Sequence, residues 1–183
     1  MDERWDEHTI GRALADPKLR EQAFTQMVRQ YSEPLYWRIR RMVFYHADAD
    51  DILQNTFLKA WKHVAQFQNK SKVFTWLYRI AINEALDFIR KQKNTLTIPV
   101  EDVSSLAQMM LADEYFDGDE AEAILHAAIA TLPDVQRMVF TLRYFEEMKY
   151  AEMSELLGTS EGALKASYHL AVKKISAFIQ TRN

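Results

Sequence analysis

Glycine and proline are scarce along this chain, with four of each among its 183 residues. These two residues are the main breakers of helices and the main formers of tight turns. Long stretches instead repeat apolar side chains at intervals of three and four residues, which is the spacing of one face of a helix. We therefore expect an all-α protein, long enough for one ordinary domain or two small ones.

Charge is distributed unevenly, although the net charge is only −3. Residues 22–93 carry twelve Lys and Arg against six Asp and Glu, whereas residues 94–131 carry eight acidic groups and no basic one. Such blocks predict two small helical domains and an acidic linker. The boundaries that we expect are 1–93 for the first domain, 94–118 for the linker and 119–183 for the second domain.

Several classes of protein are disfavoured by what the sequence lacks. Without cysteine there are no disulfides or thiolate zinc sites, and no run of about 18 apolar residues predicts a membrane span. The first residues lack the pattern of a secretory signal, which makes the cytoplasm the expected location. The five histidines show no metal-ligand spacing and no nucleophile motif occurs, so we expect no enzyme, metal, cofactor or small-molecule substrate.

The basic block predicts three helices. The first, over residues 22–46, is expected to break near Pro34, which suits the first turn of a new helix. Asp48 is expected to cap the second helix, which reaches about residue 65, because an Asp at that position accepts hydrogen bonds from free N–H groups. The third helix is expected over residues 73–92. The inward stripe of the second helix is expected at Leu53, Phe57, Ala60, Trp61 and Val64.

The second helix also has a polar face. Its residues follow one another at i, i+3, i+4 and i+7 and are Asp51, Gln54, Asn55 and Leu58. An exposed Leu among hydrogen-bonding groups indicates a contact with another protein, and the alternative is a solvated face with one stray Leu. A magnesium site at the carboxylates of 48–51 is a weaker alternative, because acidic residues at a helix start are more often caps.

The third helix combines an aromatic ring, cations and an amide. One side carries Trp76, Arg79, Asn83 and Arg90, with Lys70 and Lys72 flanking the start of the helix. Bases stack on rings at about 1–3 kcal/mol each while cations neutralise phosphates, so this combination is typical of single-stranded DNA binding. The alternative is that Trp76 simply belongs to the core.

Residues 150–170 have the pattern of a helix-turn-helix. Gly158 stands where the chain must turn, a position that commonly needs a positive φ. The side of the second helix that faces away from its apolar stripe would reach the major groove. The residues that we assign to this DNA contact are Ser160, Glu161, Lys165, His169 and Lys173. The alternative is an ordinary helical hairpin with a solvated polar face.

Three sets of residues, in this order, resemble one family. They are 48–61, 74–83, and a third set made of Leu132–Pro133, 137–140 and 161–165. Together they resemble the extracytoplasmic-function (ECF) group of bacterial RNA polymerase sigma factors, over about residues 21–93 and 119–180. The resemblance implies a factor that directs core polymerase to specific promoters and begins DNA melting, with an anti-sigma factor as a further partner.

The resemblance also implies a role for each of the three surfaces. The polar face of the second helix, with Asp51, Gln54, Asn55 and Leu58, would bind core polymerase. The minus-ten element, with a flipped base of the melted nontemplate strand, would be held by Lys70, Lys72, Trp76, Arg79 and Asn83. Double-stranded minus-thirty-five DNA would be read by the helix-turn-helix residues.

The sequence departs from the family at a few positions. Asn55 stands where Glu is common, and Leu77 stands where housekeeping members often carry a second melting aromatic. Ser167, Leu170 and Val172 occupy recognition-helix positions where cations are common. Two other functions stay open on the residues alone: a helix-turn-helix regulator that never binds core polymerase, and a sigma mimic that titrates a regulator.

Overall fold

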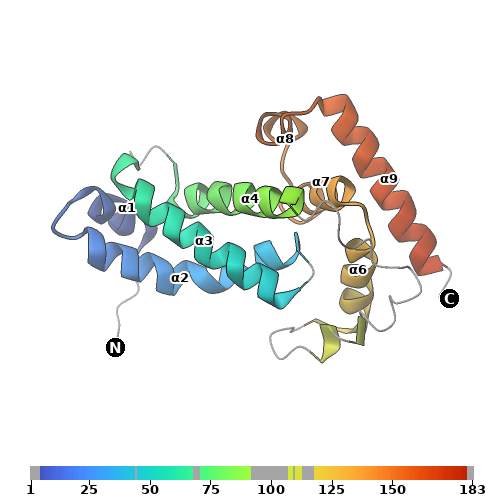
Figure 1. Cartoon of the computed structure of the whole chain (residues 1–183), viewed down its shortest axis with the longest axis horizontal. Helices are drawn as coiled ribbons and strands as arrows, with labels where there is room; N and C mark the ends of the chain where they lie inside the picture. The colour runs from blue at the N-terminus through green and yellow to red at the C-terminus, as the bar shows by residue number, and fades with distance from the viewer. Residues whose placement is uncertain are drawn as a thin grey trace. The chain divides into compact units, whose positions relative to one another are not determined.

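The structure is a computed structural model that describes residues 5–43, 45–67, 71–91, 107–108, 110–112 and 118–180. Every regular element within these ranges is a helix (Figure 1), which confirms the all-α class. The chain divides into two compact units, Met1–Lys93 and Asn94–Asn183. Most of the segment expected as an acidic linker lies outside the described residues. None of the described helices has the length and hydropathy needed to cross a bilayer.

Within its described part, the first unit is a small helical bundle. Its elements are α1 (Glu7–Ala15), α2 (Arg20–Arg40), α3 (His46–His63), the 3-10 turn η1 (Val64–Gln66) and α4 (Val73–Lys91). Helix α2 packs against α1, α3 and α4, while α3 also packs along α4 (Figure 1). The core between them contains the fully buried side chains of Ile10, Leu14, Met27, Leu35, Ile39, Met42, Ile52, Leu77 and Ile82.

Helix α2 continues through Pro34, so the expected break at that residue is wrong. A proline inside a helix removes one backbone hydrogen bond and costs about 3 kcal/mol. Met27, Leu35 and Ile39 lie on both sides of the proline, and each is 0% exposed. Burying one such side chain contributes roughly 1.5–3 kcal/mol. Packing of this face therefore offsets the proline and keeps the helix in one piece.

Helix α3 begins at His46, two residues before the Asp48 that we expected as its cap. Tyr45 is the N-cap and makes no side-chain capping bond, and Asp48 lies in the first turn. The Tyr36 hydroxyl lies 2.6 Å from His46 Nδ1, and His46 Nε2 lies 3.1 Å from an Asp50 carboxylate oxygen. The contact with α2 thus holds His46 at the start of the helix, where sequence alone favoured an acidic cap.

The buried side of α3 is also rotated from the expected stripe. Trp61, expected inward, is 45% exposed, and its ring meets Phe24 edge-on at 4.9 Å between centroids. Leu53 and Phe57 are only half-buried. The residues that α3 buries are Ala49, Ile52, Thr56 and Ala60. Because α3 packs against both α2 and α4, its buried arc is centred between these two neighbours.

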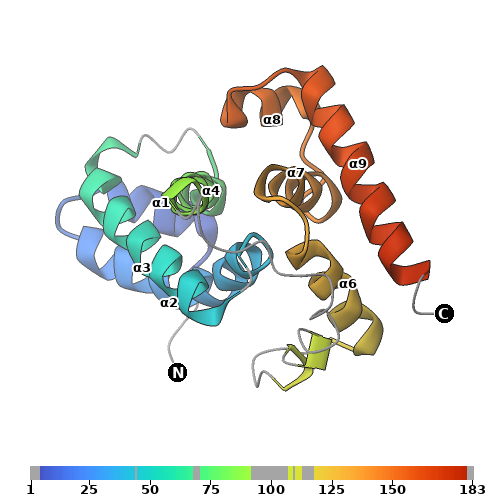
Figure 2. The ribbon, with the colours of Figure 1, turned by 45° about the vertical axis from the view of Figure 1, so that its right-hand side comes forward.

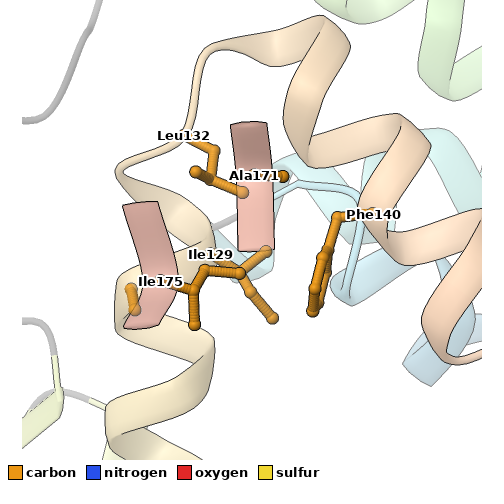
Figure 3. Packing of buried hydrophobic residues seen from close by; sticks show 6 residues of the cluster. Ile129, Leu132, Phe140, Ala171 and Ile175 are labelled. Atoms are coloured by element: carbon orange, nitrogen blue, oxygen red, sulfur yellow. The ribbon is translucent and has the colours of Figure 1, made fainter. Parts of the chain in front are cut away.

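The second unit contains α6 (Glu120–Ala130), α7 (Asp134–Tyr144), α8 (Tyr150–Leu157) and α9 (Glu161–Gln180). Helix α9 packs against the other three (Figure 2). Asp119 caps α6 by accepting the Glu122 N–H at 2.9 Å, and the chain turns at Leu132–Pro133, which confirms the expected break. One cluster of its core, drawn in Figure 3, consists of Ala128, Ile129, Leu132, Phe140, Ala171 and Ile175.

Candidate functional site

The polar face predicted on α3 is exposed along its whole length, at Asp51, Gln54, Asn55 and Leu58. Leu58 is 58% exposed, the second highest value among the large apolar side chains of the described residues. Burial raises the pKa of Asp48, and the charge of Asp51 raises it further, so acidic groups crowd the start of the helix. An apolar residue beside negative and amide groups suits a contact with a basic protein surface.

One ion pair joins α3 to α4. Lys59 of α3 pairs with Glu84 of α4, whose side chain is only 11% exposed. Consecutive residues of a helix project about 100° apart, so Lys59 and Glu84 lie beside the polar face of α3 and the cationic side of α4 and not on them. Sequence reasoning missed it, because the two residues are 25 positions apart. The contact adds to the packing that already joins α3 and α4.

The structure brings Trp76, Arg79 and Asn83 to one side of α4. Arg79, Asn83 and Lys72 are exposed, and Trp76 is half-buried. The Trp76 ring lies 5.0 Å from that of Phe67, tilted by 41°, so part of it packs against the protein and part stays accessible. Trp76 therefore combines the two alternatives: it is partly core and partly available for stacking. Lys70 lies outside the described residues.

Arg38 of α2 fixes the opposite side of α4. Its guanidinium lies 4.8 Å from the Phe74 ring centroid and 4.9 Å from that of Tyr78, and these two rings are stacked. A cation over aromatic faces is attracted by the ring quadrupoles. The contact with Arg38 holds Phe74 and Tyr78 on the side of α4 that faces α2. The cations of α4 lie on its exposed side. No signal in the sequence distinguished Arg38 from the other basic residues of its helix.

The turn between α8 and α9 is built as the sequence predicted. Gly158 has φ +63°, the left-handed conformation that favours glycine. The Ser154 hydroxyl donates to the carbonyl of Thr159 at 2.6 Å, and the Ser160 hydroxyl accepts the Ala163 N–H at 3.2 Å. Ser160 is therefore the cap of α9. Its hydroxyl already serves that role, which makes it the weakest of the residues assigned to DNA contact.

The outer face of α9 is open to solvent. Glu161, Lys165, His169 and Lys173 are all exposed, whereas Leu164 is buried. Lys165 pairs with Glu161 at 3.6 Å and lies 5.5 Å from the Tyr150 ring centroid. Exposed pairs of this kind contribute about 0–1 kcal/mol, so Lys165 can exchange Glu161 for a phosphate at little cost.

Metal ligation finds no support in the described residues, which contain no cluster of three or more His, Asp or Glu side chains able to hold an ion. Among the carboxylates at 48–51, Asp48 lies in the first turn of α3, and Asp50 pairs with His46. What the described parts of the two units present is therefore a set of surfaces: an acidic and apolar face, a cationic side with one tryptophan, and a helix-turn-helix.

Comparison with known proteins identifies the family to which these surfaces belong. Residues 27–95 match Sigma-70 region 2, and residues 122–175 match Sigma-70, region 4. The ECF RNA polymerase sigma factor SigW of Bacillus subtilis is 30% identical over 158 residues, which cover 81% of this chain and 84% of that protein. The chain belongs to the ECF sigma factors of RNA polymerase. Its function is that of an RNA polymerase sigma factor.

Two solved structures share the fold of this ECF factor. The structure of CnrH in complex with the cytosolic domain of CnrY aligns with a TM-score of 0.61 at 22% identity, over 97% of this chain and 99% of that one. The sigma factor RpoE, in complex with the anti-sigma factor NepR from Bartonella quintana, aligns with a TM-score of 0.61 at 18% identity. That alignment covers 87% of this chain and 98% of RpoE. At these identities the likeness concerns the fold.

Proposed function

We propose that the two units of this sigma factor divide promoter recognition between them. The region 2 unit binds core polymerase and captures the melted minus-ten element, and the region 4 unit binds double-stranded minus-thirty-five DNA. The observation that carries this division is the exposure of three surfaces: the polar face of α3 and the cationic side of α4 in the first unit, and the outer face of α9 in the second.

Core polymerase binds the polar face of α3 in this proposal. Asp51, Gln54 and Asn55 supply charge and hydrogen bonds, and Leu58 supplies the apolar anchor. All four side chains are exposed in the free chain, so binding requires no unfolding of α3. A central apolar residue ringed by polar groups is the usual anatomy of a binding hot spot.

The minus-ten strand binds along α4. Trp76 offers its accessible ring edge and face to an unstacked base, and Asn83 offers an amide for base-edge hydrogen bonds. Arg79, Lys72 and Lys70 neutralise the phosphates. Unpairing and unstacking a base costs a few kcal/mol, which stacking and a shaped site can offset.

The minus-thirty-five element binds the outer face of α9. Lys165 and His169 are neighbours at i, i+4 and reach one major groove, while Lys173 approaches the phosphates further along the helix. Glu161 and Ser160 stand at the start of α9, closest to the groove floor. Ser167, Leu170 and Val172 supply no cation along α9, which predicts a weak intrinsic affinity, so the region 4 unit depends on core polymerase to hold it at the promoter.

The sigma factor itself supplies no catalysis in this proposal, and RNA synthesis belongs to the polymerase. It acts in the cytoplasm, where core polymerase and the chromosome are. CnrH and RpoE were each solved with a protein partner, an anti-sigma factor in the case of RpoE. By analogy we expect that an anti-sigma factor holds this chain inactive until a signal releases it.

Transcript mapping tests the proposed function. Purified chain is mixed with bacterial core polymerase and sheared DNA from its own genome, and transcript starts are mapped with and without it. New starts that share two upstream elements at a fixed spacing support the proposal and reveal the promoter. Core binding without new starts would favour the sigma mimic, and neither core binding nor new starts would favour the helix-turn-helix regulator.

Two substitutions separate core binding from folding. Leu58→Ala should weaken core binding about tenfold, since truncating an interface anchor typically costs 1–2 kcal/mol or more. Glu33→Ala, at an exposed position on α2, is the matched control and should bind core like the natural chain. Equal core binding by both variants would remove α3 from the polymerase interface.

A further inference from the structure

The first turn of α4 donates a hydrogen bond to a residue far away in the sequence. Lys72 precedes the helix, and its side chain carries no hydrogen-bond acceptor. The first N–H groups of a helix have no partner within the helix, so they require one from elsewhere. The Phe74 N–H finds it in Glu7 Oε1 at 3.1 Å, from a residue 67 positions earlier in the chain. Glu7 therefore acts as the capping acceptor that Lys72 cannot be.

Glu7 is held in place by the anchoring of α1. Asp6 accepts the Thr9 N–H at 2.9 Å and thereby caps α1, while the side chain of Gln30 donates to the Trp5 carbonyl at 2.9 Å. Along α1, Ile10 is 0% exposed. These contacts fix both the start of the helix and its inner face. The Glu7 carboxylate thus comes from a rigid element.

The other end of α1 is closed as well. Arg20 Nε donates to the carbonyl of Leu14 at 3.0 Å, and Leu14 is itself 0% exposed. Helix α1 also packs against η1, the turn that leads to Phe67 and its contact with Trp76. Helix α1 thus contacts η1, which precedes the connection to α4, and also the first turn of α4 itself. Helix α1 precedes residues 27–95, the part that matches Sigma-70 region 2.

We infer that Glu7 is a positioning residue for minus-ten recognition: it holds the first turn of α4, and with it Trp76, in the geometry that receives the melted strand. The inference rests on the proposed role of α4. Helix ends fray when their N–H groups lose partners, and a negative charge at the N-terminus is also favoured by the helix dipole. Without Glu7 the first turn opens more often, and the base-stacking ring is correctly placed for a smaller fraction of the time.

The experiment compares full-length variants bound to core polymerase. The probe is a fluorescent single strand that carries the nontemplate minus-ten sequence found by transcript mapping. Glu7→Ala should weaken binding of this strand roughly two- to fivefold, which is the effect of losing one helix cap when only the capped turn binds. Glu7→Gln keeps the acceptor oxygen and should retain most of the affinity. Glu33→Ala is the control for an exposed glutamate on α2.

A second-site rescue distinguishes positioning from general stability. Lys72→Ser places a capping hydroxyl next to the helix and should make Glu7 dispensable. This double-mutant cycle measures the effect of Glu7→Ala in the natural chain and again in the Lys72→Ser chain. Both chains of the second comparison lack the Lys72 charge, so its loss does not contribute to the difference between them. We expect the two- to fivefold effect in the first background and less than half of it in the second. Amide exchange at residues 74–76 should follow the same pattern, with core affinity unchanged.

The outcomes separate this inference from the function on which it rests. If Trp76→Ala weakens strand binding but Glu7→Ala does not, the positioning role is wrong and the function of α4 stands. If neither substitution weakens binding, the proposed minus-ten surface itself is wrong. An equal Glu7→Ala effect in both Lys72 backgrounds, or a parallel loss of core affinity, would also overturn the inference, because it would show a general loss of fold.

Discussion

Two glycines only four residues apart should respond to alanine with opposite signs. Gly158 has φ +63°, and a Cβ added there meets no atom within 4 Å. The cost of an alanine at this position therefore comes from the backbone conformation and not from a steric clash. The left-handed conformation costs an alanine about 1–2 kcal/mol, and restricting the unfolded chain returns about 0.4–1 kcal/mol of this. Gly158→Ala should therefore destabilise the second unit by about 1 kcal/mol.

Gly162 provides the matched control. It lies in the first turn of α9, and a Cβ added there also meets no atom within 4 Å. Alanine is favoured over glycine inside a helix by about 0.8–1 kcal/mol. Gly162→Ala should therefore stabilise the unit by nearly the amount that Gly158→Ala costs. At about 4–8 °C per kcal/mol for a domain of this size, the two melting temperatures should differ by roughly 10 °C.

The distribution of tryptophan makes the assay selective. All four tryptophans lie in the first unit, so their fluorescence reports that unit alone, while far-ultraviolet circular dichroism reports the helices of both. Thermal unfolding of the full chain should shift in the dichroism signal and stay unchanged in fluorescence. Destabilisation by both substitutions, or a fluorescence shift equal to the dichroism shift, would refute the reasoning from local backbone geometry.

Three further predictions address single contacts. Arg137→Met should destabilise the second unit by roughly 2–3 kcal/mol in urea unfolding, because the Arg137 side chain is only 13% exposed and its guanidinium donates to the Ala130 carbonyl at 3.2 Å and to Asp134 at 2.5 Å. A loss below about 0.5 kcal/mol would show that these bonds are dispensable. Lys165→Ala should weaken promoter binding and reduce the slope of log K against log salt by about one, measured by titration at several salt concentrations; an unchanged slope would remove Lys165 from the phosphates. Hydrogen bonds from Thr9 lower the pKa of Asp6 in the folded chain. The stability that ionised Asp6 gives to α1 should therefore be fully present above the ordinary Asp pKa and should be lost as pH falls from that value through the lowered pKa. Amide exchange in α1 should show this loss in the natural chain and not in Asp6→Asn.

Features that depend on residues within one helical turn were predictable from the sequence. Gly158 was expected to take a positive φ and does, since no other residue accepts that conformation as easily. The exposed faces of α3 and α9 were also expected, because side chains at i, i+3, i+4 and i+7 share one side of any helix. These patterns also carry the family resemblance, so the all-α class and the sigma factor function could be inferred from them.

Features that depend on a distant partner were decided only by the tertiary structure. Pro34 stays inside α2 because the side chains around it are buried by neighbouring helices, and Trp61 turns outward because α3 packs between two others. The capping of α4 by Glu7 joins residues 67 positions apart, and the pair of Lys59 and Glu84 joins residues 25 apart. Local periodicity determines which side chains share a face. Only the packing of one helix on another determines which face is buried and which distant group completes a helix end.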